Sequence, residues 1–185
     1  MPSNFSSKKT PFKDLLILNQ FSFNDNRGSF IKLYSENFFK EKKFQIRQVN
    51  YSLNKTKGTI RGMHYQVGGY AEEKIVTCIK GKIFDVVIDL RKNSKTYLKW
   101  YDIILNSKYK RSLFVPKGFA HGFQTLDDNT EIIYLHSKNH SKKHERTINS
   151  LDPKINIKWP IKKKILSYKD RRQNFINNNF RGISV

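Results

Sequence analysis

The chain has 185 residues, a length that fits one domain with a sizeable core. Its formal net charge is +21, it has no apolar run long enough to span a membrane, and Cys78 is its single cysteine. One thiol excludes an internal disulfide, and because the first ten residues lack an apolar leader we expect a cytoplasmic protein.

The strong positive charge has three interpretations. Lysine and arginine form short clusters scattered along the chain, whereas a nucleic-acid binder would concentrate them on one face or in one arm. A second interpretation is an anionic small substrate that the field of the protein attracts. The third is compositional bias, since the chain is rich in Lys, Asn and Ile and has only two alanines. We expect neither a nucleic-acid partner nor a membrane partner.

The first third of the chain predicts strands separated by turns. Alanine is scarce while aromatic and β-branched residues are plentiful, which favours strands over helices. Strands are expected over residues 14–23, 29–34, 46–53 and 59–66, with turns over 24–28 and 54–58. A short helix is expected over residues 35–43, with Ser35 as its N-cap.

The remaining chain continues this pattern. Apolar strands over 73–79 and 82–90 flank Lys80 and Gly81, and this is the clearest predicted hairpin. Further strands are expected over 97–105, 111–115, 122–126 and 131–137, whereas residues 161–185 are polar and less regular. Many short strands without a repeat or a linker indicate one all-β domain over residues 1–185, a sandwich or a barrel.

Several side chains could carry chemistry. In the strand over 59–66, Arg61 and His64 point to opposite faces unless Gly62 bends or bulges the strand. A histidine on a strand is either structural or catalytic, and spacing leaves both roles open. Other candidates follow in the second half of the chain: His121, Tyr134, His140, Glu145, Lys169 and Asp170.

Common cofactor and nucleophile signatures are missing from the sequence. There is no His-x-His pair, and His140 and His144 lie in a charged stretch that reads as a loop, so we expect no metal. Cys78 lies in an apolar strand, and neither a Gly-x-Ser-x-Gly elbow nor a glycine-rich phosphate loop occurs. Acid–base chemistry by His, Tyr, Lys and Asp without a cofactor remains.

Seven stretches together resemble the dTDP-4-dehydrorhamnose 3,5-epimerase family. They are "NRGSF", "KGTIRGMHYQ", "EKIVTCIKGKIFDVVIDLRKNSKTY", "LFVPKGFAHGFQTL", "IIYLHS", "HERTINSLDPKINIKWP" and "LSYKD", in the order of the family from about residue 12 to about residue 170. The resemblance implies a cupin-type double-stranded β-helix, or jelly-roll barrel, with one or two short helices. It also implies a homodimer that exchanges an N-terminal strand, and a nucleoside-diphosphate 4-keto-6-deoxy sugar as substrate, with no metal or cofactor.

The resemblance also implies roles for individual residues. His64 becomes the general base, Asp170 its orienting partner, Tyr134 the general acid, and Lys74 the cation beside the 4-oxygen of the sugar. Substrate positions fall on Arg27, Gln48, Asn50, Arg61, His121, His140, Glu145 and Lys169.

Two positions depart from the pattern of the family. His140 stands where a tyrosine stacks on thymine, and Lys32 stands where an acidic residue is usual. The nucleotide and the choice of C3, C5 or both carbons therefore stay open. A mono-epimerase acting on another nucleotide sugar, and a non-catalytic sugar-nucleotide-binding cupin, remain as alternatives.

Overall fold

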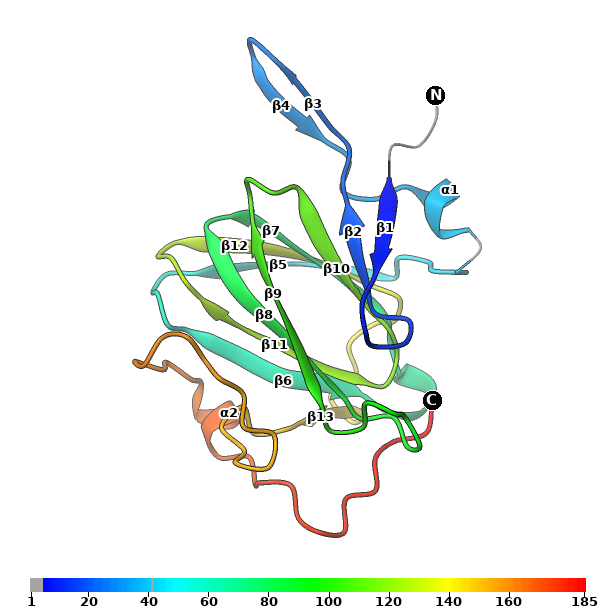
Figure 1. The fold of residues 1–185 in the computed structure, drawn as a ribbon, viewed down its shortest axis with the longest axis vertical. Coiled ribbons are helices and arrows are strands. Elements are labelled where there is room, and N and C mark those ends of the chain that lie inside the picture. The colour runs from blue at the N-terminus through cyan, green and yellow to red at the C-terminus, as the bar shows by residue number, and fades with distance from the viewer. Residues whose placement is uncertain (1–4, 41) are drawn as a thin grey trace.

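Two antiparallel sheets that face each other form the body of the molecule (Figure 1), in a computed structural model that describes residues 5–40 and 42–185. The six-stranded sheet has the order β1 (Ser6–Lys9), β2 (Leu16–Asn19), β10 (Arg111–Val115), β7 (Lys74–Lys80), β12 (Thr130–His136) and β5 (Gln48–Asn54). The five-stranded sheet has the order β13 (Glu145–Thr147), β6 (Ile60–Gln66), β11 (Phe119–Thr125), β8 (Lys82–Asp89) and β9 (Trp100–Asn106). The predicted all-β, jelly-roll architecture is confirmed.

The helices are short and lie outside the sheets. Helix α1 (Glu36–Phe39) follows Ser35 as predicted, although the Ser35 side chain makes no capping hydrogen bond. Helix α2 (Tyr168–Arg171) is capped by the Ser167 hydroxyl, and a 3-10 turn, η1, spans Gly68–Tyr70. Residues 1–4 of the N-terminal stretch and residue 41 of the expected helix lie outside the described residues. No helix in the described part of the chain is long and apolar enough to cross a membrane.

The predicted hairpin at Lys80 and Gly81 is wrong. Strand β7 pairs with β10 and β12, whereas β8 pairs with β11 and β9, so the chain passes from one sheet to the other at Gly81. Both strands are buried on both faces along most of their length, as expected of central strands that need neighbours on both edges. The strand expected over 14–23 is likewise divided, into β2 and part of the hairpin of β3 (Ser22–Asp25) and β4 (Gly28–Ile31).

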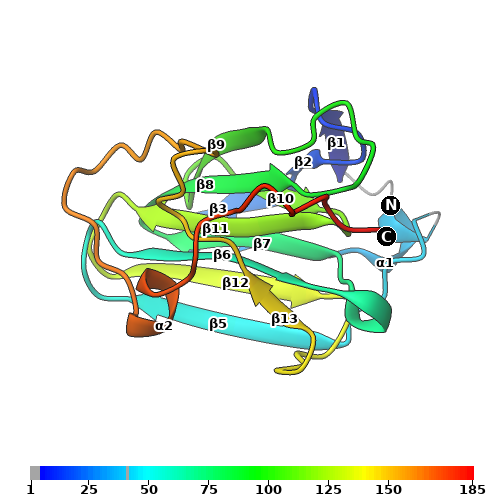
Figure 2. The same ribbon diagram turned by 90° about the horizontal axis from the view of Figure 1, so that it is seen from below.

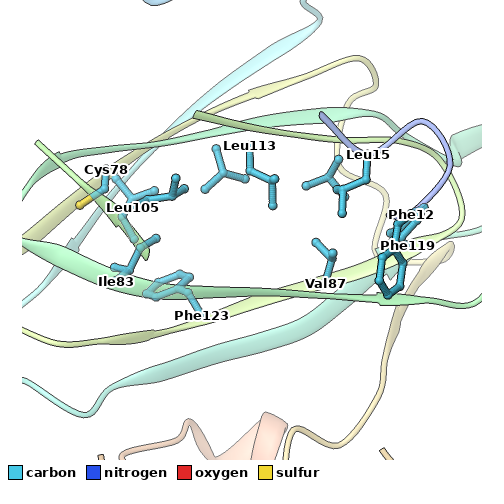
Figure 3. Close-up of a cluster of buried hydrophobic side chains, with 12 residues drawn as sticks. Phe12, Leu15, Cys78, Ile83, Val87, Leu105, Leu113, Phe119 and Phe123 are labelled. Carbon is cyan, nitrogen blue, oxygen red and sulfur yellow. The ribbon is translucent and has the colours of Figure 1, made fainter. Parts of the chain in front are cut away.

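Apolar side chains fill the space between the sheets and cover their outer faces. Figure 3 shows the inner cluster, in which Leu113 of β10 faces Val87 of β8 and Phe123 of β11. The chain after β13 packs Ile155 and Ile176 on the outer face of the five-stranded sheet. This packing fixes the C-terminal segment that carries α2, which lies beside β6 (Figure 2).

The β3–β4 hairpin projects away from the body of the molecule (Figure 1). Phe23 and Phe30 are register partners on it and expose 53% and 68% of their surface. Large aromatic side chains on a projecting arm are candidates for burial against another molecule.

Candidate active site

A cleft of about 580 Å³ opens between the two sheets, a size typical of small-molecule sites. Its walls come from β5, β7 and β12 on one side and from β6, β11 and β13 on the other. Eight of the predicted site residues line it: Asn50, Arg61, His64, Lys74, His121, Tyr134, His140 and Glu145.

His64 and Asp170 form a pair at the wall made by β6. Nε2 of His64 lies 2.8 Å from Oδ1 of Asp170, and the aspartate side chain is only 6% exposed. Burial alone would raise the pKa of Asp170, but the hydrogen bond from His64, that from Ser167 and the charge of Lys169 hold it below the usual value. Asp170 therefore stays ionised and fixes the imidazole, while Nδ1 of His64 makes no hydrogen bond to the described residues.

A bulge at Gly62 brings Arg61 and His64 into the same cleft. The register of β6 against β11 shifts between the pair His64–His121 and the pair Arg61–Phe123. Gly62 has a φ of +126°, and a Cβ there would lie 2.6 Å from Cα of Gly122. Of the two arrangements that the sequence left open, the strand adopts the one with both side chains at one site, and Nε of Arg61 donates to Asn54 at 2.7 Å.

Tyr134 lies on β12, in the sheet opposite His64. Its ring packs 6.2 Å from that of His121 and 5.9 Å from that of His136, measured between centroids. Burial and the nearby charge of Asp85 raise the pKa of Tyr134, and the charge of Arg61 offsets this only in part. The phenol is therefore protonated at neutral pH and can act as a proton donor.

Two buried acid–base pairs that the sequence analysis did not identify flank Tyr134. His121 Nε2 lies 2.7 Å from Oδ1 of Asp85, whose side chain is fully buried and whose pKa burial raises. On the other side Glu72 lies 3.0 Å from Nζ of Lys74 and 2.8 Å from Nδ1 of His136. Burial alone would raise the pKa of Glu72, but the charge of Lys74 and the contacts of His136 lower it to about 2.

The outer end of the cleft holds the remaining polar candidates. Glu145 on β13 accepts a hydrogen bond from Lys169 and lies 3.6 Å from Nε2 of His140. Burial alone would raise the pKa of Glu145, but the hydrogen bond from Lys169 and the charges of Lys169, His64 and His140 hold this pKa below its usual value. Gln48 donates to Asn50 and accepts a hydrogen bond from the backbone N–H of His140, so β5 holds the loop that carries His140.

Arg27 is the predicted substrate residue that the fold does not bring to this cleft. It lies at the tip of the β3–β4 hairpin, where its side chain is 83% exposed and pairs with Asp25 at 2.6 Å. Lys32, which departs from the pattern of the family, is also exposed and does not line the cleft.

Glu72, Asp85 and His136 had only weak signals in the sequence. Asp85 is a carboxylate within the apolar stretch "KIFDVVIDL", which is unusual for a buried strand. Glu72 and His136 are 64 residues apart, so only strand pairing joins them. Burial raises the pKa of Cys78 to about 12, so its thiol stays protonated and acts as a packing group. Among the described residues there is no cluster of three or more His, Cys, Asp or Glu side chains that could hold a metal ion.

Comparisons with known proteins identify the family of this chain. A sequence model of the family described as dTDP-4-dehydrorhamnose 3,5-epimerase matches residues 9–178. The dTDP-4-dehydrorhamnose 3,5-epimerase of Shigella flexneri is 41% identical over 176 residues, which cover 93% of this chain and 97% of the relative.

Solved structures of related enzymes are also similar to this chain. A crystal structure of the enzyme of that name from Bacillus anthracis, with TDP and pyrophosphate bound, superposes with a TM-score of 0.89 at 36% identity and covers 93% of this chain and 99% of its own. A crystal structure of a dTDP-6-deoxy-D-glucose 3,5-epimerase from Legionella pneumophila, in complex with dTDP-4-keto-L-rhamnose, superposes with a TM-score of 0.85 at 32% identity and covers 90% of each chain. Because the family model matches residues 9–178 and these relatives and structures cover most of the chain, this chain belongs to the dTDP-4-dehydrorhamnose 3,5-epimerase family.

Proposed function

We propose that this enzyme epimerises a dTDP-linked 4-keto-6-deoxy hexose at C3, at C5 or at both, through an enolate, in deoxysugar biosynthesis. The observation that carries the proposal is the position of His64 and Tyr134 on opposite sheets facing one cleft, with Lys74 on β7, the strand next to the one that carries Tyr134. Inversion of a carbon requires removal of a proton from one face and its return to the other, so the base and the acid must be different groups.

His64 is the base in this mechanism. The C4 ketone acidifies the protons on C3 and C5, because the carbanion formed there delocalises onto the ketone oxygen. Asp170 holds Nε2 of His64 in its protonated tautomer, which leaves Nδ1 as the acceptor of the substrate proton. The negative charge of Asp170 then stabilises the imidazolium that forms.

Lys74 stabilises the enolate oxygen, and Tyr134 returns a proton. A preorganised donor aimed at a developing oxyanion is typically worth about 2.7–4 kcal/mol. Because the raised pKa of Tyr134 keeps its phenol protonated, it can deliver that proton from the sheet opposite His64. The sugar itself needs no cofactor for these steps, since the ketone is its own electron sink.

The diphosphate binds beside Arg61, and the base of the nucleotide binds toward the outer end of the cleft. Arg61 provides a guanidinium that can bind phosphate oxygens bidentately. Gln48, Asn50, His140, Glu145 and Lys169 surround the remaining space, and His121 contacts the sugar beside Tyr134. Such a substrate and the single buried thiol, Cys78, fit an enzyme of the cytoplasm.

Arg27 contributes in the same proposal from a second copy of the chain. The exposed Phe23 and Phe30 of the hairpin, and the exposed Val49 and Tyr51 of the edge strand β5, are apolar surfaces that a homodimer with exchanged N-terminal arms would bury. The hairpin of one subunit would then present its Arg27 to the cleft of the other subunit.

Mixing two inactive variants tests this arrangement. If Arg27 acts in the cleft of the partner, Arg27→Ala and His64→Asn subunits that are unfolded and refolded together should recover roughly a quarter of the wild-type activity, since half of the dimers are mixed and each has one intact cleft. No recovery, in a sample shown by light scattering to be dimeric, would place Arg27 in the cleft of its own subunit, and an Arg27→Ala variant that is active before mixing would place it outside the site.

Exchange with solvent tests the reaction itself. The protein is incubated in heavy water with dTDP-4-keto-6-deoxyglucose, and deuterium is followed by mass and by the proton signals of C3 and C5. Two deuterons indicate a double epimerase and one indicates a mono-epimerase, whereas a bound but unexchanged substrate would favour the non-catalytic sugar-nucleotide-binding cupin.

A further inference from the structure

The buried carboxylate of Glu72 lies between Lys74 and His136 in the wall of the cleft. Its Oε1 is 3.0 Å from Nζ of Lys74 and its Oε2 is 2.8 Å from Nδ1 of His136. The side chains of Glu72 and Lys74 are each 7% exposed and that of His136 is 12% exposed. Each oxygen of the carboxylate therefore has its own partner, and the three groups lie away from bulk water.

The sheet determines this arrangement through strand register. Lys74 on β7 is the register partner of His136 on β12, and His136 is in turn the register partner of Gln48 on β5. Side chains in one row of an antiparallel sheet point to the same face, which here is the cleft. Glu72 precedes β7 by two residues, so its side chain returns to the side of Lys74 and reaches both partners.

A chain of hydrogen bonds determines the form of His136. Nε2 of Gln48 donates to Oδ1 of Asn50, so that Nδ2 of Asn50 faces Nε2 of His136 at 3.3 Å and donates to it. His136 then carries its proton on Nδ1 and donates it to Glu72. Every donor in the chain points toward Glu72, which keeps this carboxylate ionised and fixed in place.

The charges around Lys74 come from both sheets and from loops. Glu72 is the carboxylate in direct contact with Nζ of Lys74. The buried Asp85 is a second nearby carboxylate, and it is hydrogen-bonded to His121. The carboxylate of Glu145 also lines the cleft, but it is paired with Lys169. The remaining titratable side chains of the lining are Tyr51, Arg61, His64, Tyr65, Tyr134, His136 and His140. Without Glu72, no carboxylate of the described residues would remain within ion-pair distance of Nζ of Lys74.

From this geometry we propose that Glu72 is a positioning residue that keeps Lys74 cationic and aims its ammonium at the enolate oxygen, with His136 holding the carboxylate. This role rests on the proposed function, in which Lys74 stabilises the enolate. Glu72 itself does not touch the sugar in this assignment. Loss of Glu72 would leave a desolvated ammonium without its counter-ion, and such a group gives up its proton at lower pH.

The Glu72→Gln variant tests the proposal through its pH profile. Because the ammonium acts on charge that develops only in the transition state, kcat for solvent exchange should fall about tenfold at pH 8 while KM changes little. The alkaline limb of the kcat profile should also move down by about one pH unit, because the lysine deprotonates earlier. A profile with the same limb as the wild type would overturn the proposal.

A neighbouring carboxylate provides the matched control. Glu73 is chemically identical, but its side chain lies near Lys42 and Lys117 in a different hollow of the surface. Glu73→Gln should therefore leave kcat and the alkaline limb unchanged. An equal shift in both variants would show that the effect comes from net charge alone and would contradict the positioning role.

Two further variants separate positioning from folding. Glu72→Asp keeps the charge but withdraws the carboxylate by one methylene, so kcat should fall while the alkaline limb stays in place, and a wild-type kcat would contradict the role. Adding Glu72→Gln to a Lys74→Gln background should have almost no further effect on exchange, because Glu72 acts through Lys74. A full multiplicative loss in that background would also overturn the proposal.

Failure of the proposal and failure of the proposed function are distinguishable. If the wild-type protein binds the sugar nucleotide without exchanging any proton, the proposed reaction is wrong. The ionisation of Lys74 can still be followed in wild type and in Glu72→Gln, from the pH at which its ¹³Cε chemical shift changes. A midpoint at the same pH in both proteins would overturn the role of Glu72 independently of activity.

Discussion

Replacement of Gly62 by alanine tests the bulge that brings Arg61 and His64 into one cleft. The added Cβ would lie 2.6 Å from Cα of Gly122 and 2.8 Å from the carbonyl oxygen of His121, and neither backbone atom can move away as a flexible side chain could. The φ of +126° adds a conformational cost of about 1–3 kcal/mol for a residue with a side chain. With the overpacking cost of about 1–3 kcal/mol, we expect a destabilisation of about 3 kcal/mol.

Thermal unfolding and solvent exchange measure the two consequences of this change. For a chain of this length, about 3 kcal/mol corresponds to a fall in Tm of about 6–12 °C. The rate of hydrogen exchange into the sugar should fall by a larger factor than the fraction of folded protein, because β6 and β11 would move apart next to His64. Gly69→Ala is the control, since it has an ordinary φ and open space around its Cβ, and it should change stability by less than about 0.5 kcal/mol. Equal stability and activity of the two variants would refute the reasoning.

Four other predictions concern single groups. Asp170→Asn should slow exchange about 10–100-fold, because His64 loses a charged partner worth about 1.5–3 kcal/mol, and a wild-type rate would contradict the pairing. Tyr134→Phe should still permit deuterium to enter the substrate while inverted product falls sharply, and equal loss of both would assign Tyr134 another role. The lowered pKa of Glu72 means that its contribution of about 3 kcal/mol is present above pH 4.5 and is lost as pH falls toward 2, so urea unfolding of Glu72→Gln should lack this pH dependence. Calorimetry with dTDP, UDP, CDP and GDP should show weak base preference that His140→Tyr increases, since an aromatic contact adds about 0.5–1.5 kcal/mol, and a strong dTDP preference unchanged by His140→Tyr would contradict this.

Local patterns predicted the strands better than their partners. The strand over 111–115 was predicted with the bounds of β10, because its apolar run ends at a proline and its surroundings are polar. The turn at Gly81 was also located, yet the strands on either side enter different sheets. Period-2 patterns reveal which residues are buried, but they carry no information about which strand lies alongside, so pairing across the sandwich could not be derived.

The candidate site likewise combines residues that the sequence indicated with contacts that depend on strand pairing. The family resemblance predicted roles for His64, Tyr134, Lys74 and Asp170. Spacing alone left the direction of His64 open, because the bulge at Gly62 depends on a contact with Gly122, sixty residues away in sequence. Glu72 and His136 were missed since their pairing depends on the register of β7 against β12. Arg27 lies on an arm whose surroundings in an assembly do not follow from one chain.

His64 and Tyr134 lie on different sheets, so the distance between them depends on the apolar core that separates the sheets. In the proposed reaction, inversion of the sugar therefore depends on how that core is packed. The separation of the two sheets is set by side chains such as Leu113, Val87 and Phe123, none of which has a polar atom to offer a sugar (Figure 3). A truncation such as Leu113→Ala would let the sheets approach or tilt, which changes the gap that the sugar ring must span. With His64 as the proposed base and Tyr134 as the proposed acid, proton removal needs one wall and inversion needs both. Loosened variants should therefore release sugar that has exchanged its hydrogens with solvent but has not been inverted.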